Sequence, residues 1–474
     1  MSTRSNVRIE RDSMGEMEVP ADALYGASTM RAVLNFPISG LGFPRPFIRA
    51  LGLIKQSAAK TNMSLGLLEE KTGNAIVAAA QEVIDGALDQ HFVLDIFQTG
   101  SGTSTNTNAN EVIANRASQI LGGDLGSKLV HPNDHVNMGQ SSNDVIPTSI
   151  HLAALLSIKE DLIPGLEFLA EELNKKADEF WPVVKTGRTH LQDATPVRLG
   201  QEFKGFAGQA EYSVQRLHRA QEALAEVALG GTAVGTGVNT HEEFSARTCK
   251  IVSEASGVFI KETASHFQAQ SALDALVEVS GVLKTIAISL HKIANDIRFM
   301  ASGPRAGLGE IALPEVQPGS SIMPGKINPV ISESVIQVVA QVVGNDASVT
   351  LAGQGGYFEL NTMMPVAAHN ILQSISLLAA SAHNFAGQCV KGITATSVGP
   401  DMVEKGLMLG TALAPAIGYD AAAAIAKEAS AKGTTIREMA KEKTELSDAE
   451  LDELLDLEAM TEPGIGAGGA GGGG

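Results

Sequence analysis

The 474-residue sequence contains only two cysteines, Cys249 and Cys389. Two thiols cannot supply the four-thiolate ligand set of the usual iron–sulfur cluster, nor a cysteine-rich structural zinc site. We expect both side chains to act as small apolar residues within helices. The sequence therefore gives no reason to expect a metal ion or another cofactor.

Long apolar runs are missing as well. No stretch of eighteen or more apolar residues occurs, so no membrane-spanning helix is expected. The first twenty residues contain no apolar core that could act as a secretion signal. Together with the low cysteine content, these absences favour a cytoplasmic protein.

Positive charge is in deficit, because 35 Lys and Arg residues face 53 Asp and Glu residues, a net charge of −18. An acidic surface repels nucleic acid and anionic membranes, so neither is an expected partner. Any site for an anionic substrate must therefore supply its own local donors and cations.

Several common catalytic motifs are absent. The sequence has no P-loop, no GxSxG elbow and no HExxH motif, which leaves nucleotide use, serine hydrolysis and zinc proteolysis without support. The run GGTAVGTG at 230–237 superficially suggests a dinucleotide loop. It follows a helical pattern and not a strand, so we interpret it as a helix end and a tight turn.

Helical periodicity dominates the centre of the chain, and aromatic residues, at 4%, are few. Apolar or small residues recur at alternating spacings of four and three, which is typical of long helices packed at shallow angles. Five such helices are predicted, at 148–180 (with a kink at Pro164), 199–227, 276–300, 330–350 and 368–389. Their apolar residues occupy more than one face, which favours self-association. The predicted fold class is all-α, with a central five-helix bundle that assembles into a tetrameric core.

The flanking regions have different patterns, so three domains are predicted, at 1–138, 139–393 and 394–474. The first mixes loops with short helices at 47–62 and 74–87, and with a helix at 111–121 for which Asn110 is the expected cap. In the last, Ser447 is expected to cap a helix over 448–457. The terminal GIGAGGAGGGG cannot bury a core and is predicted to be disordered.

Four polar segments interrupt the helical pattern, at 100–111, 131–144, 187–196 and 318–329. Each one alone could be a connecting loop. Together they supply hydroxyls, amides and a cation, which are the donors that a small dicarboxylate needs. The residues with these groups are Ser101, Thr103, Ser141, Ser142, Asn143, Thr189, Lys326 and Asn328.

Removal of a proton next to a carboxylate needs a base shielded from water and strong stabilisation of the charge that develops. His190 is one candidate, because imidazole titrates near neutral pH. The segment SSIMPGK is flanked by glycine and could close as a lid, which makes Ser320 or Ser321 the other candidate. The residues alone leave this choice open.

These segments together resemble the fumarase/aspartase superfamily, and PGSSIMPGKINP is similar to its signature loop. The closer resemblance is to class II fumarases, through FQTGSGTSTN, HPNDHVN, QSSND, GRTHLQDA, LGGTAVGTG and ALVEVSG. It extends from about Arg8 to about Leu457. Ser142, Gly231 and the run FQTGS at 97–101 favour fumarases over aspartases.

The resemblance implies an active site and its roles. Ser320 resembles the base that removes the C3 proton of L-malate, and His190, paired with Glu333, the partner in proton transfer. The implied substrate contacts are Ser101, Gly102, Thr103, Ser141, Ser142, Asn143, Thr189, Ser321, Lys326, Ile327 and Asn328. A second dicarboxylate site is implied at Lys128, His131, Pro132, Asn133 and Asp134, although Lys128 stands where the family often has arginine, a better bidentate donor.

The resemblance also implies the reversible hydration of fumarate to L-malate without a cofactor, by a homotetramer whose active sites draw on three subunits. Two alternatives remain: an aspartate ammonia-lyase, and an inactive helical scaffold. Retention of Ser320, Lys326, Asn328 and His190 argues against the scaffold, because packing alone does not require that polar set.

Overall fold

The computed structural model describes residues 7–464. The predicted disorder of the Gly-rich tail therefore falls, from residue 465 onwards, outside the described residues. Residue contacts divide the chain into two compact units, each described here by itself. Unit 1 comprises 1–164, 213–288 and 338–380, and unit 2 comprises 165–212, 289–337 and 381–474. The three predicted domains stay a prediction.

Unit 1 begins with a β-hairpin that the sequence analysis did not anticipate. Strand β1 (Val7–Asp12) pairs antiparallel with β2 (Gly15–Pro20), with Val7 opposite Pro20. Helix α1 (Ala27–Asn35) follows. The sequence pattern did not predict this hairpin, because its alternation is short and one of its faces is charged.

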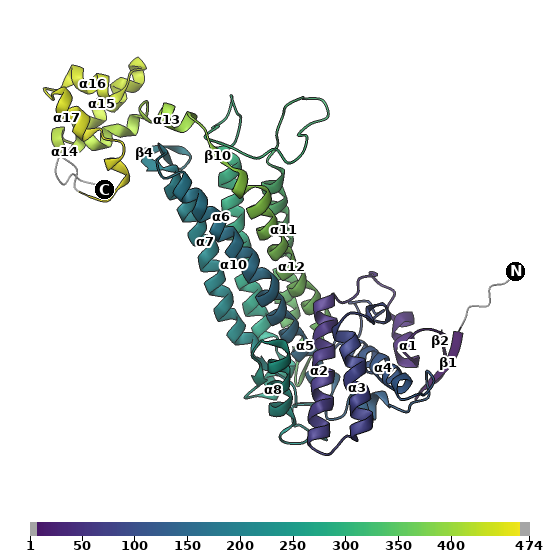
Figure 1. The fold of residues 1–474 in the computed structure, drawn as a ribbon. Helices are drawn as coiled ribbons and strands as arrows, with labels where there is room; N and C mark the ends of the chain where they lie inside the picture. Colours follow the sequence, from purple (N-terminus) through teal and green to yellow (C-terminus); the bar gives the residue numbers. More distant parts are fainter. Residues whose placement is uncertain (1–6, 465–474) are drawn as a thin grey trace. The chain divides into compact units, whose positions relative to one another are not determined.

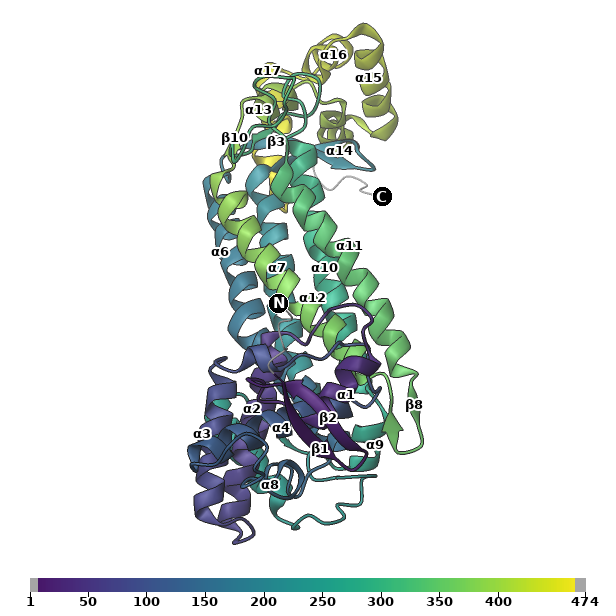
Figure 2. The same ribbon diagram turned by 90° about the vertical axis from the view of Figure 1, so that its right-hand side faces the viewer.

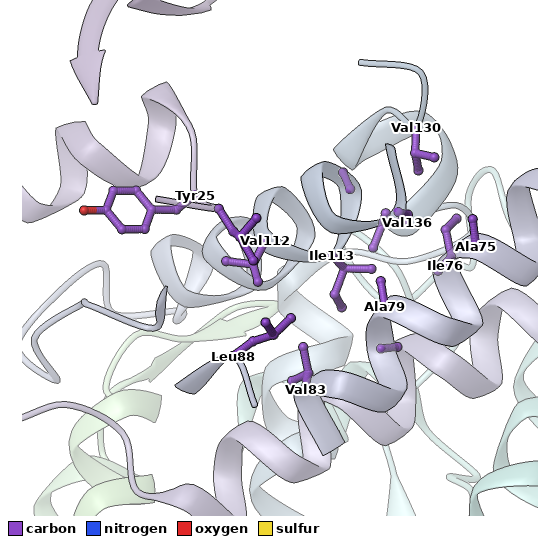
Figure 3. Packing of buried hydrophobic residues seen from close by; sticks show 14 of the residues in the cluster. Tyr25, Ala75, Ile76, Ala79, Val83, Leu88, Val112, Ile113, Val130 and Val136 are labelled. Carbon is purple, nitrogen blue, oxygen red and sulfur yellow. The ribbon is translucent and has the colours of Figure 1, made fainter. Parts of the chain in front are cut away.

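Three helices form the core of this N-terminal region: α2 (Arg45–Ser64), α3 (Glu70–Ile84) and α4 (Thr103–Ile120). The helices predicted at 47–62 and 74–87 are thereby confirmed. Figure 3 shows Val112 and Ile113 of α4 facing Ala79 and Val83 of α3 across a close-packed apolar cluster. This burial of aliphatic side chains is the main force that holds the three helices together.

The predicted start of the helix at 111–121 is wrong. Helix α4 begins at Thr103, and Asn110 lies buried inside it and is not its cap. The run of Ser, Thr and Asn looked like a surface loop, yet Thr105, Asn106 and Asn108 are buried as well. Hydrogen bonds explain this, since the Asn108 amide donates to the His91 carbonyl at 2.9 Å. Tertiary partners thus overrode the loop preference of these residue types.

The predicted long helices are confirmed. They are α5 (Ser142–Ser157) with α6 (Ile163–Glu179), α7 (Leu199–Leu224), α10 (Asp274–Met300), α11 (Val330–Gly353) and α12 (Met364–Gln388). A wide turn at Ile158–Leu162 separates α5 from α6, directly before the predicted irregularity at Pro164. In both ribbon views α7, α10, α11 and α12 lie side by side (Figures 1 and 2). The fold class is mainly α, as predicted.

Helix α11 is long and apolar enough, by length and composition alone, to cross a membrane. Buried helices of soluble proteins meet the same criterion. Its Asp346 accepts hydrogen bonds from Ser280 at 2.8 Å and Lys284 at 2.6 Å, both on α10, which ties the helix to its neighbour in unit 1. Only 39% of its apolar stretch is buried in one chain.

Unit 2 contains the antiparallel hairpin of β3 (Val184–Thr189) and β4 (Gln192–Arg198), and the pair β7 (Ile311–Ala312) and β10 (Thr394–Ala395). Near the C-terminus, α15 (Tyr419–Lys432), α16 (Ile436–Lys443) and α17 (Asp448–Leu454) pack around their own apolar cluster. The predicted cap is confirmed, because Ser447 accepts a hydrogen bond from the Glu450 amide, although α17 ends three residues before Leu457.

Both cysteines are buried, as predicted. Cys249 lies in α8 (Phe244–Ser256), and Cys389 directly follows α12. Burial raises the pKa of each thiol to about 12, so neither is a ready nucleophile. The remaining short strands and α-helices of the described residues are β5 (Glu226–Val227), β6 (Lys261–Glu262), α9 (His266–Ser271), β8 (Gly356–Tyr357), β9 (Leu360–Asn361), α13 (Val398–Val403) and α14 (Ala414–Ile417).

Candidate active site

Unit 1 brings three predicted substrate contacts together in a chain of hydroxyls. Thr103 Oγ1 lies 2.7 Å from Ser101 Oγ and 2.7 Å from Ser142 Oγ. Thr103 begins α4 and Ser142 begins α5. The first backbone N–H groups of a helix have no partner within the helix and attract anions. Two helix starts and three hydroxyls thus converge on one place that suits a carboxylate.

Local sequence explains this convergence. Gly102 has a φ of +70°, and a Cβ at this position would lie 2.9 Å from the side chain of Ile146 on α5. Only glycine fits so closely between the two helix starts. Asn143 donates to the Ala233 carbonyl at 2.7 Å, and Ser141 Oγ accepts from the Asn143 amide.

Asp144 supports this cluster and was missed in the sequence analysis. Its buried carboxylate accepts from the amides of Ser141, Gly230 and Thr232, at 2.9, 3.0 and 2.9 Å. It therefore caps α5 and holds the GGTAVGTG turn beside Asn143. Burial raises the pKa of Asp144, against the lowering effect of these hydrogen bonds. The capping pattern S-x-x-D at 141–144 was the signal that could have identified it.

Lys55 is a second supporting residue that was missed. Its side chain is completely buried on α2, and its ammonium donates to Asn137 Oδ1 at 2.8 Å and Gln140 Oε1 at 3.0 Å. These partners lie in the segment that leads into Ser141. Burial lowers the pKa of Lys55 to about 7, although the negative charge of Asp144 opposes the shift. No sequence signal distinguished this lysine from a surface lysine on an amphipathic helix.

Unit 2 holds Thr189 and His190 at the tip of the β3–β4 hairpin. The sequence analysis treated 187–196 only as a polar interruption, whereas it forms two paired strands. Both His190 and Leu191 have positive φ, 56° and 60°, and both are exposed. No hydrogen bond or ion pair joins His190 to Glu333 within the described part of one chain. The predicted pairing therefore stays a prediction.

The segment 318–329 is an irregular, largely exposed loop in unit 2. Ser320 Oγ accepts from the backbone amides of Ile322 at 3.3 Å and Met323 at 3.1 Å. Two such donors stabilise negative charge on the oxygen and favour its deprotonated form. The neighbouring hydroxyl of Ser321 accepts no such hydrogen bond from the described part of the chain. This geometry distinguishes the two serines, which the sequence could not.

Other residues of this loop are placed as follows. Asn328 donates its amide to the Gly319 carbonyl, which closes the base of the loop. Across the described residues, the Lys326 ammonium forms no hydrogen bond or ion pair, and the side chains of Lys326 and Ile327 are exposed. Glu333 is exposed in the first turn of α11. A free ammonium beside a serine with bound amides suits a carboxylate ligand.

The residues of the predicted second dicarboxylate site surround a cavity of about 330 Å³ in unit 1. Lys128, His131, Pro132 and Asn133 line it, while Asp134 is hydrogen-bonded to His131 beside it. Three carboxylates also line the cavity, from Glu10, Asp12 and Glu111. Lys128 donates to the Arg11 carbonyl at 3.1 Å.

No cluster of three or more His, Cys, Asp or Glu side chains within residues 7–464 is arranged to hold a metal ion. The expectation of a cofactor-free site stays a prediction.

Comparisons with known proteins agree with one another. A lyase family model matches residues 15–344, and a model of the fumarase C C-terminus matches 409–462. The class II fumarate hydratase of Halobacterium salinarum is 56% identical over 97% of this chain and 98% of its own length. The mitochondrial fumarate hydratase of Saccharomyces cerevisiae is 50% identical over 97% and 95%.

A solved structure supports the same assignment. The class II fumarase of Schistosoma mansoni superposes with a TM-score of 0.94 at 38% identity, over 96% of this chain and 99% of its own. The predicted resemblance is confirmed, in sequence and in fold. The chain therefore belongs to the class II fumarate hydratase family of lyases.

Proposed function

We propose that this chain catalyses the reversible hydration of fumarate to L-malate. The observation that carries the proposal is full-length similarity to class II fumarate hydratases, together with Ser320, His190 and the Ser101–Thr103–Ser142 hydroxyls at the matching motifs. The same similarity favours fumarate over aspartate as substrate.

In the proposed mechanism the substrate carboxylates bind to the hydroxyl cluster and to Lys326. Ser320, as the alkoxide, takes the C3 proton of malate, and the electron pair moves into the adjacent carboxylate to give a doubly charged enediolate. Its collapse forms the double bond and expels the C2 hydroxyl, which leaves as water after protonation by His190. The Ile322 and Met323 amides support this base assignment, because they stabilise the alkoxide.

Absorbance of the fumarate double bond tests the reaction. We expect L-malate to generate absorbance and L-aspartate to give none. Ser320→Ala should lower kcat by about a thousandfold, the range for loss of a general base, with helical content unchanged. Ser321→Ala is the matched comparison: as an implied substrate contact it should raise KM but retain most of kcat. Equal losses in the two variants would contradict the base assignment, and a response to aspartate alone would contradict the substrate.

We further propose a homotetramer with active sites shared between subunits. Two observations support it: the predicted site residues are distributed over both units of one chain, and α11 exposes an apolar face. That face consists of Ala340, Val343, Gly344, Ala347 and Leu351, spaced as one side of a helix. A second copy of the chain would cover it.

The second dicarboxylate site also remains a proposal. His131 supports it, since its side chain lines the cavity and is held in place by the backbone amides of Asn133 and Asp134 at Nδ1. Of the three lining carboxylates, Glu10 and Asp12 are paired with Arg8 and Arg31, and Glu111 accepts backbone amides at the start of α1. A cytoplasmic location and the lack of nucleic-acid or membrane partners are proposed from composition alone.

A further inference from the structure

The tip of the β3–β4 hairpin holds an unfavourable backbone conformation at the candidate site. Thr189 pairs with Gln192, so His190 and Leu191 are the two central residues of a tight turn, and both have positive φ. Such turns are normally formed by Asn-Gly or Gly-Gly, because a side chain with a Cβ is crowded in this region. The Leu191 side chain is 75% exposed, so its own packing contributes little to holding the turn. The pairing of β3 with β4 closes the turn, and side-chain contacts at its base can hold it further.

The candidate is a buried ion cluster at the base of the turn. Arg188, next to Thr189, donates from Nη2 to Glu310 Oε1 at 2.8 Å. The other oxygen of Glu310 lies 2.9 Å from Lys185 Nζ, as an ion pair and not a well-aligned hydrogen bond. Glu310 is 5% exposed and Lys185 is 1% exposed. One carboxylate thus fixes two points on the strand that leads to His190.

Glu310 is itself held firmly. Its amide donates to the Met300 carbonyl at 2.9 Å, and its carbonyl accepts from the Thr396 amide at 3.0 Å. It also directly precedes β7, from which the chain continues into the Ser320 loop. Glu310 therefore connects strand β3, which leads to His190, with the stretch of chain that leads into the Ser320 loop.

Glu202 provides a built-in comparison. Its carboxylate binds the same Lys185, at 3.0 and 2.9 Å, from the first turn of α7. Among the described residues no hydrogen bond or ion pair joins it to Arg188, although the two charges influence each other through space. Within residues 7–464, Lys185 thus forms ion pairs with two carboxylates, whereas Arg188 forms its ion pair with Glu310.

We propose that Glu310 is a positioning residue for the proposed hydration reaction: through Arg188 it holds the Thr189–Gln192 turn, and with it Thr189 and His190, in the strained conformation that presents them to substrate. The inference rests on the proposed function for its effect on catalysis. The statement that Glu310 controls the conformation of the turn does not depend on the proposed function.

The test compares Glu310→Gln with Glu202→Gln in the full-length chain. Both variants remove one negative charge next to Lys185, and only the first replaces the carboxylate that accepts from Arg188 with a neutral amide. We expect Glu310→Gln to lower kcat for L-malate by tenfold to about a hundredfold, the range for misplaced catalytic groups, measured well below its unfolding temperature. Amide hydrogen exchange over 184–198, read by mass spectrometry, should become faster. Glu202→Gln should keep kcat within about twofold and leave that exchange unchanged.

Equal losses of kcat in the two variants, or unchanged exchange of the hairpin in Glu310→Gln, would overturn the proposal. If Glu310→Gln does not fold, Arg188→Met removes the other half of the same bond and should reproduce both effects. The wild-type protein separates the two hypotheses. A wild type without activity on malate refutes the proposed function, whereas the exchange comparison still tests whether Glu310 holds the turn.

Discussion

At the scale of single residues, Lys55 and Asp144 show how buried charge organises the candidate site. Asp144 accepts from the backbone amide of Ser141 and so caps the helix that begins at Ser142, while Lys55 holds the segment before it. An isolated buried ammonium is costly, and its partners here are the neutral oxygens of Asn137 and Gln140. In return, Lys55 fixes the position of the segment that leads into Ser141.

This cost predicts a pH dependence of stability. The pKa of Lys55 is about 7 in the folded protein and about 10.5 when unfolded, so between these values the unfolded state binds one more proton. Stability from this group therefore rises with pH by about 1.4 kcal/mol per unit across the window. The difference in unfolding free energy between wild type and Lys55→Met, measured in urea at pH 8, 9 and 10, should change by that slope.

A suitable control is Lys60→Met, on the same helix but partly exposed and bonded to Gln56. It should give a nearly constant difference across the same pH range. A constant difference for Lys55→Met as well would mean that Lys55 is charged in the folded protein at pH 8 and above.

The candidate bases were predictable at this scale, but the choice among them was not. The sequence offered His190, Ser320 and Ser321, because all three have suitable chemistry. Hydrogen bonds from the Ile322 and Met323 amides are the reason for which we propose Ser320. Such bonds depend on the backbone path of the loop, which no residue pattern specifies.

At the scale of elements, the long helices were predictable and the short polar elements were not. A 3.5-residue apolar period reflects burial of one helix side along its whole length, so α7, α10 and α12 were found with small errors at their ends. The start of α4 and the β3–β4 hairpin are rich in polar residues, so no apolar period marks them in the sequence. Their stability comes from partners distant in sequence, such as His91 for Asn108 and Glu310 for Arg188.

The close approach of α4 to α5 predicts the effect of Gly102→Ala. The new methyl group would meet Ile146 at 2.9 Å and separate Thr103 from Ser142, while positive φ adds strain of about 1 kcal/mol. We expect kcat/KM for malate to fall at least about tenfold. Gly66→Ala is the matched control, with nearly the same φ of +71° and no atom within 4 Å of the new Cβ. It should lower the unfolding temperature slightly and leave kcat/KM unchanged; similar activity losses would show that strain alone is responsible.

At the scale of the whole molecule, one chain leaves too much apolar helix surface exposed. On the α11 face the side chains of Val343 and Leu351 are 40% and 62% exposed. The small residues Ala340, Gly344 and Ala347 lie on the same side of the helix and allow close contact with another helix. The sequence already predicted this surplus from apolar residues on more than one side of the helices. A charge at its centre, Val343→Glu, should therefore reduce the oligomer mass measured by sedimentation velocity and lower activity as the protein is diluted. Leu67→Glu, an exposed apolar residue 50% accessible beyond α2, should do neither.

Shared active sites predict recovery of activity from two inactive variants. If Ser320 and His190 of one site come from different chains, a mixed oligomer of Ser320→Ala and His190→Asn subunits contains some sites with both residues intact. Random assembly of equal amounts places an intact residue at each of the two positions half of the time, so about a quarter of wild-type activity should return after co-refolding. Mixing Ser320→Ala with the double variant Ser320→Ala/His190→Asn supplies no intact Ser320 and should restore nothing. If the first mixture also stays inactive although the subunits have exchanged, both residues of a site belong to one chain, and the polar segments must converge within it.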